Sequence, residues 1–292
     1  MPVSTGLGAL GLSEPPRQAC HRFDRMSHSL RKARIFLHIG KGVLLAATIF
    51  QAANAAKKQA MIRKWSQQLL ALCGMKIVVH GNEHTIDTGA LVVGNHVSWI
   101  DIYVVNAWRP TPFVAKSEIA KWPVIGWLAK TIDTIFIERE KRGDARRIMH
   151  QLAAQMTAGK NVFVFPEGTT GDGSGLLPFH SNLFQAAVSA GAPVQPVAMV
   201  YLDAQGKHTL APAYIGDMSL LDTLNAMLDA KPLQVHLYVG EGIAPGTERR
   251  ALSAKVEGVI GAALTAMREG RDPESAVREL GEATAVGVSV NE

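Results

Sequence analysis

The chain is poor in cysteine, and the common motifs for metal binding, phosphate binding and nucleophilic catalysis are missing from it. Its two cysteines, Cys20 and Cys73, stand apart without the spacing of metal ligands, and no HExxH or CxxC motif occurs. There is also no P-loop and no GxSxG nucleophile elbow. We therefore expect no metal site, no covalent catalysis by cysteine and no serine hydrolase chemistry. Two isolated cysteines also fit a reducing compartment.

Acidic residues are scarce in the N-terminal part of the chain. Eleven lysines and arginines but one acid, Asp24, lie between Arg17 and Lys64, so this stretch carries about +10 although the whole chain carries +5. The basic residues lie on both sides of an apolar stretch at residues 35–56. Basic flanks around an apolar helix are typical of binding to anionic lipid, so we expect membrane lipids rather than nucleic acid as the partner.

This apolar stretch is not a clean membrane span. A span needs roughly 20 apolar residues, and His38, Lys41, Gln51 and Asn54 interrupt this one. We expect a helix that lies in the membrane interface or dips partway in; a long soluble helix packed on the domain is the alternative. A signal peptide is disfavoured, because some thirty residues precede the apolar segment and no small-x-small site closes it.

The remainder of the 292-residue chain, which is 47% hydrophobic, is expected to form one α/β domain. Beta-rich runs are expected to form strands at residues 76–80, 90–94, 112–115, 134–137, 162–165, 194–201 and 233–239. Helical patterns occupy residues 59–73, 144–157, 183–190, 220–230 and 251–267. We expect a disordered basic leader at residues 1–28, membrane-associating helices at 29–75, a folded domain at 76–269 and a disordered tail at 270–292.

Residues 95–101, Asn-His-Val-Ser-Trp-Ile-Asp, place an imidazole and a carboxylate five positions apart after a predicted buried strand. An imidazole with a pKa of about 6.5 can accept a proton near neutrality, and a carboxylate on its other nitrogen fixes the tautomer and stabilises the imidazolium. We therefore predict that His96 is a general base for a hydroxyl and that Asp101 orients it. Ser98 and Asp101 also fit a helix capping box, and the two roles are compatible. Metal binding by the pair is the remaining alternative.

A second group of polar residues follows the predicted strand at residues 162–165. Glu167 and Thr169 could bond substrate hydroxyls, and Gly168 allows close backbone approach to a bound group; a plain strand-to-loop turn explains the same residues equally well. Arg139, just past another strand, could bind an anionic head group or lie in solvent.

Four blocks in this order resemble the motif blocks of the glycerolipid acyltransferase family, which includes the 1-acylglycerol-3-phosphate acyltransferases. The resemblance covers about residues 60 to 245, and the blocks are Asn95-His96-x4-Asp101, Phe136-Ile-x-Arg139, Phe165-Pro-Glu-Gly-Thr169 and Val194-x-Pro196-Val197.

The resemblance implies a mixed-sheet α/β fold flanked by helices, on the cytoplasmic face of the bacterial inner membrane. It implies an acyl thioester of acyl-carrier protein or coenzyme A as donor, with no further cofactor. His96 would be the base and Asp101 its orienter. Acceptor binding would fall to Arg139, Glu167, Gly168 and Thr169, and Lys116 would lie near the acceptor head group, although a strand-end lysine is more often simply solvated.

The chain departs from many lysophosphatidic acid acyltransferases at two positions. Thr170 stands where those members have arginine, a natural phosphate ligand, and His180 stands where lysine or arginine is frequent. The run through Thr170, with residues 176–179 and 214–217, looks more like bacterial lyso-ornithine lipid O-acyltransferases. We therefore expect acyl transfer to the hydroxyl of lyso-ornithine lipid, with Thr170 in the acceptor site. The alternatives are 1-acylglycerol-3-phosphate acylation and a non-catalytic membrane-tethered lipid-binding protein.

Overall fold

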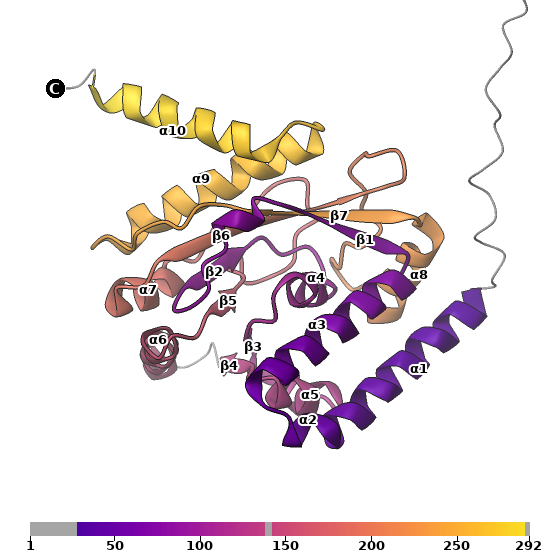
Figure 1. The fold of residues 1–292 in the computed structure, drawn as a ribbon. Helices are drawn as coiled ribbons and strands as arrows, with labels where there is room; N and C mark the ends of the chain where they lie inside the picture. Colours follow the sequence, from indigo (N-terminus) through magenta and orange to yellow (C-terminus); the bar gives the residue numbers. More distant parts are fainter. Residues whose placement is uncertain (1–27, 138–141, 290–292) are drawn as a thin grey trace, which may run out of the picture.

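The structure is a computed structural model that describes residues 28–137 and 142–289 of the chain (Figure 1). The helices and 3-10 turns of this part are α1 (His28–Ala47), α2 (Ile49–Ala52), α3 (Ala55–Leu72), η1 (Asn82–His84), α4 (Asp101–Trp108), η2 (Ser117–Lys121), α5 (Ile125–Thr131), α6 (Arg142–Thr157), η3 (Ser181–Phe184), α7 (Gln185–Ala190), α8 (Leu220–Ala230), α9 (Arg249–Arg268) and α10 (Pro273–Ser289). The strands are β1 (Met75–His80), β2 (Leu91–Gly94), β3 (Val114–Lys116), β4 (Ile135–Ile137), β5 (Val162–Val164), β6 (Val194–Leu202) and β7 (Leu233–Val239).

A mixed five-stranded sheet lies at the centre, with strand order β1-β7-β6-β2-β5. Strands β6, β2 and β5 are mutually parallel, β7 is antiparallel to β6, and β1 is parallel to β7. Strands β3 and β4 form a small parallel pair, which a bridge between Phe113 and Phe163 joins to the edge strand β5. Each of the seven predicted β-rich runs overlaps a strand, and the predicted mixed α/β class is confirmed.

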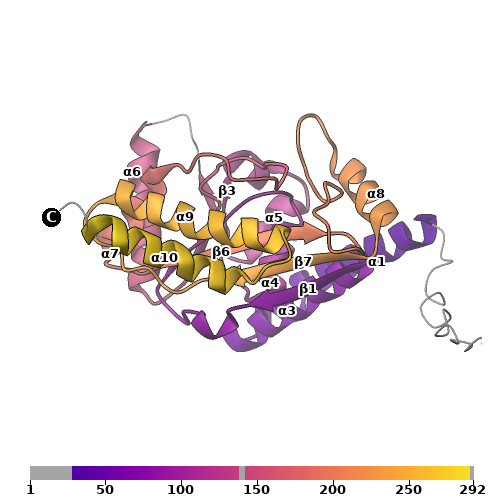
Figure 2. The same ribbon diagram turned by 90° about the horizontal axis from the view of Figure 1, so that it is seen from above.

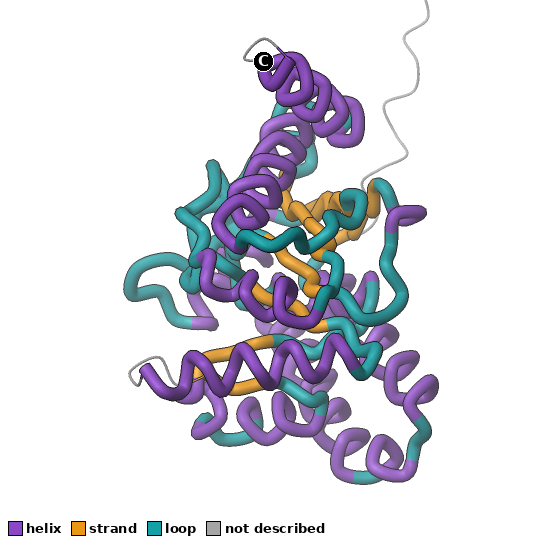
Figure 3. Tube along the Cα trace, turned by 90° about the vertical axis from the view of Figure 1, so that its left-hand side faces the viewer, coloured by secondary structure: helices purple, strands orange, loops and turns teal. Residues whose placement is uncertain are grey.

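Helices cover both faces of this sheet, as Figure 3 shows. The core on one face includes buried residues of α3, α4 and α8, and the core on the other includes buried residues of α6, α7 and α9. Strands β2 and β6 are buried along their whole length. Continuous apolar runs such as Leu91-Val-Val are typical of strands covered on both faces. The central strands thereby hold the turns that follow them in fixed positions.

Helix α1 packs on α3 through a reciprocal contact between His38 and Trp65. The two rings stack at 4.7 Å, Nε2 of His38 lies 3.0 Å from the carbonyl oxygen of Trp65, and the indole N–H donates to the carbonyl of His38 at 3.2 Å. A Cβ on Gly42 would lie 2.5 Å from the Trp65 ring, so glycine is required there. The outer face of α1 still exposes large apolar side chains, among them Leu37 and Leu44.

None of the helices in residues 28–137 and 142–289 has both the length and the apolar character that a membrane span requires. The predicted disordered leader, residues 1–28, lies outside the described residues except for His28, where α1 begins.

The prediction of a disordered tail at residues 270–292 was wrong for most of its length. Residues Pro273–Ser289 form α10, which lies beside α9 over the sheet (Figure 2). The helix starts with Pro273, and the Asp272 carboxylate accepts the backbone N–H of Ser275 at 3.0 Å. A capping Asp followed by Pro at the first helical position is a helix start signal. The prediction missed it because the tail has no clear apolar periodicity. Burial of Ala276 provides the tertiary contact that a short helix needs for stability.

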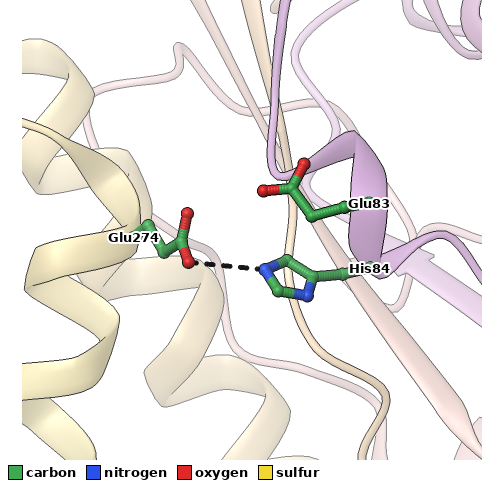
Figure 4. Close-up of side chains that lie close together, drawn as sticks. All are labelled: Glu83, His84 and Glu274. Carbon is green, nitrogen blue, oxygen red and sulfur yellow. Dashed lines mark ion pairs between the residues drawn. The ribbon is translucent and has the colours of Figure 1, made fainter.

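An ion pair joins η1 to the first turn of α10 (Figure 4). Nε2 of His84 lies 3.5 Å from Oε1 of Glu274, and the same oxygen lies 3.6 Å from Nη2 of Arg278. Strand β1 runs antiparallel to β2. The ion pair follows the carboxyl end of β1, so it lies at the opposite end of the strands from the turn after β2. It therefore contributes to the attachment of α10.

Candidate active site

His96 and Asp101 meet in the turn between β2 and α4, at the carboxyl end of a parallel strand. Nδ1 of His96 lies 2.8 Å from Oδ2 of Asp101, whose side chain is fully buried, while the imidazole is 20% exposed. A carboxylate can only accept, so Nδ1 carries the proton and Nε2 is the basic nitrogen. Among the residues that the structure describes, no hydrogen bond to Nε2 is found. The arrangement can therefore take a proton from a bound hydroxyl.

The predicted capping box is only half formed. Oδ2 of Asp101 accepts the backbone N–H groups of Val97 and Ser98 at 2.7 and 2.8 Å, which is the carboxylate half of the motif. The hydroxyl half is wrong, because Ser98 Oγ accepts from Ile100 at 3.4 Å and α4 begins at Asp101 without a side-chain cap. The carboxylate turns back into the preceding loop because it must reach both these amides and His96.

Tyr201 is a member of this network that the sequence did not reveal. Its fully buried hydroxyl, on β6, donates to Oδ1 of Asp101. Burial, followed by the negative charge of Asp101, raises the pKa of Tyr201 well above its ordinary value, so the hydroxyl stays a donor. Asp101 thus receives hydrogen bonds at both oxygens. The only signal in the sequence was the place of Tyr201 at the end of a predicted strand.

Glu167 is buried behind the His96 turn, with 5% of its surface exposed. Oε1 accepts the backbone N–H of His96 at 2.7 Å, and Oε2 accepts that of Leu177 at 2.8 Å. Burial raises the pKa of Glu167 to about 7, although the two backbone hydrogen bonds and the nearby His96 act in the opposite direction. The carboxyl group ties the two loops together, and its predicted contact with the acceptor stays a prediction.

Two further residues of the motif blocks hold the imidazole in place. The ring of His96 stacks on Phe165 with a centroid distance of 3.9 Å and an angle of 12°. The buried amide of Asn95 pairs with the backbone of Met199 on β6, donating to the carbonyl at 3.0 Å and accepting the N–H at 2.7 Å. The turn after β2 is therefore attached to both neighbouring strands. Both residues belong to the predicted motif blocks, but the sequence predicted no role for either.

The loop after β5 closes over the same turn. Gly171 donates its N–H to the carbonyl of His96 at 2.8 Å, and the Thr170 hydroxyl donates to the carbonyl of Tyr214. Gly168 has φ of +71°, which favours glycine, and Thr169 is exposed. The structure thus brings the loop beside His96 and gives the hydroxyl of Thr170 a partner within the protein.

The two predicted cationic residues differ in what the structure shows. Lys116 is exposed at the end of β3, and β3 is linked in parallel to β5, so it lies at the same edge of the sheet as the His96 turn. Arg139 falls outside the described residues. One group of possible metal ligands exists in the described part of the chain, Glu83 with His84 and Glu274, and it includes neither catalytic candidate.

A model of the Acyltransferase family matches residues 76–200, which contain the His96 turn and the loop after β5. A lyso-ornithine lipid O-acyltransferase from Pseudomonas aeruginosa is 36% identical over 247 residues, which cover 82% of this chain and 94% of that protein. The chain belongs to the acyltransferase family. It is therefore an enzyme that transfers acyl groups, and the resemblance of the four motif blocks is confirmed.

Relatives of the acyltransferase family with a second named activity are equally similar. A 1-acyl-sn-glycerol-3-phosphate acyltransferase from Neisseria meningitidis is 35% identical over 249 residues, which cover 81% of this chain and 96% of that protein. The crystal structure of the 1-acyl-sn-glycerophosphate acyltransferase of Thermotoga maritima matches with a TM-score of 0.58 at 22% identity, covering 81% of this chain and 96% of that one. The latter likeness shows that the two proteins share a fold.

Proposed function

We propose that this acyltransferase moves a fatty acyl group from a thioester to the free hydroxyl of a membrane lysolipid, with His96 as the general base. The observation that carries the proposal is the 2.8 Å contact between Nδ1 of His96 and Oδ2 of Asp101. It leaves the basic Nε2 without a hydrogen-bond partner among the residues that the structure describes.

The reaction needs no covalent enzyme intermediate. Nε2 of His96 takes the hydroxyl proton as the acceptor oxygen attacks the thioester carbonyl. The carbon–sulfur bond then breaks, and the imidazolium returns its proton to the departing thiolate. Proton transfer by a positioned base contributes about 10²- to 10⁴-fold, and alignment of the two substrates supplies much of the remainder. The negative charge of the buried Asp101 stabilises the imidazolium formed between the two steps.

Lyso-ornithine lipid is the proposed acceptor. Thr170 and His180 stand where a phosphate-binding member would be expected to carry cations, and the hydroxyl of Thr170 is already bonded to the carbonyl of Tyr214. The Pseudomonas aeruginosa relative is named for this acceptor. Lysophosphatidic acid is the second candidate, because the equally similar Neisseria meningitidis relative is named for it.

We infer that the donor is an acyl thioester of acyl-carrier protein or of coenzyme A. We also infer that the enzyme works at the cytoplasmic face of the bacterial inner membrane. The outer face of α1 supports binding to a membrane surface, because it exposes Leu37 and Leu44 while the described chain before Glu83 contains no acid. Such a helix fits the interface of an anionic bilayer.

A competition assay tests the acceptor. Purified full-length enzyme receives equimolar lyso-ornithine lipid and lysophosphatidic acid in mixed micelles, with acyl-carrier protein and coenzyme A thioesters in parallel reactions, and mass spectrometry follows both products. We expect faster acylation of lyso-ornithine lipid. Faster consumption of lysophosphatidic acid would make phosphatidic acid the product.

The His96→Ala variant in the same assay separates catalysis from lipid binding. We expect the loss of both products with a folded protein and at most a small fall in melting temperature, because the imidazole is partly exposed and the Asp101 carboxylate keeps its three other donors. Turnover near the wild-type rate would overturn the proposed mechanism. Lipid binding without turnover in the wild type would identify a non-catalytic lipid-binding protein.

A further inference from the structure

Four large apolar side chains are exposed together at the end of η2 and the start of α5. They are Trp122, Val124, Ile125 and Trp127, with 44%, 48%, 41% and 40% of their surfaces exposed. We call these four residues the α5 apolar surface. The four residues lie within six positions of the chain, and grouped exposed apolar residues mark interaction sites on folded proteins more often than single ones do.

The backbone holds this surface in a strained conformation. Val124 has φ of +62° and ψ of −56°, and the N–H of Ile125 donates to the carbonyl of Pro123 at 2.6 Å. This is a classic γ-turn, which is rare and costly, most of all for a β-branched residue. Gly126 is buried, and a Cβ there would lie 2.5 Å from the carbonyl oxygen of Ala120. Val124 and Ile125 are thus exposed on a turn whose backbone conformation is strained.

The N-terminal segment beside the α5 apolar surface is basic. Helix α5 contacts α1, and Figure 1 shows it beside α1 and α2 at one end of the fold. Residues 28–82 contain nine lysines and arginines and no acid. Next to the α5 apolar surface in the sequence lie the exposed Lys121 and Lys130, with the exposed Glu118 and Asp133 three residues further out on each side. Apolar side chains within a basic field fit the head-group region of an anionic bilayer.

We propose that the α5 apolar surface is a second membrane-docking element, which inserts into the interface of an anionic bilayer beside the N-terminal helices. It begins six residues after Lys116, whose strand ends at the sheet edge that holds the His96 turn. Docking at this point brings the bilayer surface to the active-site edge, so a lysolipid can present its hydroxyl without leaving the membrane. This inference goes beyond the proposed reaction, because docking is measured without turnover.

Vesicle binding by full-length variants tests the proposal. The double variant Trp122→Ala/Trp127→Ala is compared with Leu210→Ala, which removes a side chain that is 56% exposed in the loop after β6. Partition onto vesicles of equal phosphatidylglycerol and phosphatidylethanolamine is measured by sedimentation. Because a buried tryptophan covers about 150–250 Å² and these are almost half exposed, we expect at least about tenfold weaker partition of the double variant. Leu210→Ala should partition like the wild type.

Fluorescence gives a second readout on the same proteins. Lipids with brominated acyl chains should quench part of the wild-type tryptophan emission and clearly less in the double variant. His96→Ala should bind vesicles normally, so a failure of the proposed chemistry leaves this proposal standing. Equal partition of wild type and a folded double variant overturns it. So does a wild-type dimer in sedimentation velocity that the double variant abolishes, because the surface would then bind a second copy.

Discussion

Tyr201 and His96 hydrogen-bond to opposite oxygens of the same carboxylate, Oδ1 and Oδ2 of Asp101. Oδ2 also accepts two backbone N–H groups, so the carboxylate receives four donors and is fully buried. Such a carboxylate is fixed in position and shares its charge among several partners. The orientation of His96 therefore depends on β6 as well as on the motif that contains it.

Removal of the Tyr201 hydroxyl should change the pH profile of the reaction. Without this donor, the Asp101 carboxylate interacts more strongly with His96, so Tyr201→Phe should move the acidic limb of the kcat/KM profile to higher pH. The rate at the optimum should fall about tenfold, since one hydrogen bond to a charged group contributes about 1.5–3 kcal/mol. Tyr238→Phe, in the equally buried site on β7, is the control. A loss of stability with an unchanged pH profile would show a purely structural role.

Substitutions of Asp101 should separate its two roles. Asp101→Ala leaves the amides of Val97 and Ser98 and the hydroxyl of Tyr201 without their buried acceptor. We expect a loss of about 3 kcal/mol or more in the free energy of unfolding, because each such group costs about 1–3 kcal/mol. Asp101→Asn retains one acceptor oxygen and should lose less stability, yet both variants should lose activity.

Urea unfolding followed by circular dichroism, together with kcat/KM, measures the two effects of the Asp101 variants. The exposed Asp87→Ala is the control, and it should cost less than about 1 kcal/mol because it breaks a surface ion pair. Equal stability of Asp101→Ala and Asp101→Asn would show that the carboxylate does not hold the turn.

Glu167 should make the stability of the protein depend on pH. Burial raises its pKa in the folded protein from 4.5 to about 7, so the fold favours the protonated form. The contribution of Glu167 to stability is therefore fully present below pH 4.5 and is lost as pH rises through about 7, a change of about 3 kcal/mol in the free energy of unfolding from this group alone. Above that pH its contribution is constant.

Unfolding of the Glu167→Gln variant between pH 4.5 and 8 measures this contribution. The variant should be less stable than the wild type at low pH, because its side-chain NH2 group faces the backbone N–H of either His96 or Leu177. Its free energy of unfolding should not show the wild-type slope against pH. Glu279→Gln, at an exposed position on α10, should keep the slope. Parallel slopes for all three proteins would assign the pH dependence to another group.

Thr170→Arg should move acceptor preference toward lysophosphatidic acid. A guanidinium at this position offers a charge-assisted hydrogen bond of about 1.5–3 kcal/mol to a phosphate, which corresponds to roughly tenfold or more in relative kcat/KM. Thr170→Val is the control, because it loses the hydrogen bond to the carbonyl of Tyr214 without adding charge. If Thr170→Val changes selectivity as much as Thr170→Arg, the loop position rather than the charge determines the acceptor.

Charge on the outer face of α1 should release the enzyme from membranes. Leu37 and Leu44 are 73% and 64% exposed, so Leu37→Glu/Leu44→Glu leaves the packing on α3 intact while it repels anionic lipid. We expect the variant in the soluble fraction and partial extraction of the wild type by high salt, which screens the basic residues. Leu221→Glu, on α8, serves as the control. Retention of the α1 variant in the membrane pellet would place the anchor elsewhere.

The strands and the catalytic pair could be predicted from the sequence because their signals are local. Apolar runs bounded by turn residues predicted every strand to within one or two residues, and α8 was predicted at its observed bounds. His96 and Asp101 are five positions apart, so a single turn is enough to bring them together. The prediction of a disordered tail was wrong, because α10 depends on a helix start signal and on packing against α9 rather than on apolar periodicity.

Only the tertiary structure decided what surrounds the pair. Tyr201 lies 100 positions after Asp101, and Glu167 lies 71 after His96; no spacing along the chain connects them. They meet because β6 and β5 pair with β2 on either side, and parallel pairing places the carboxyl ends of all three strands at one edge. A sequence states which side chains are available to the chemistry. The order of the strands, which depends on long-range packing, determines which of these side chains lie next to the catalytic pair.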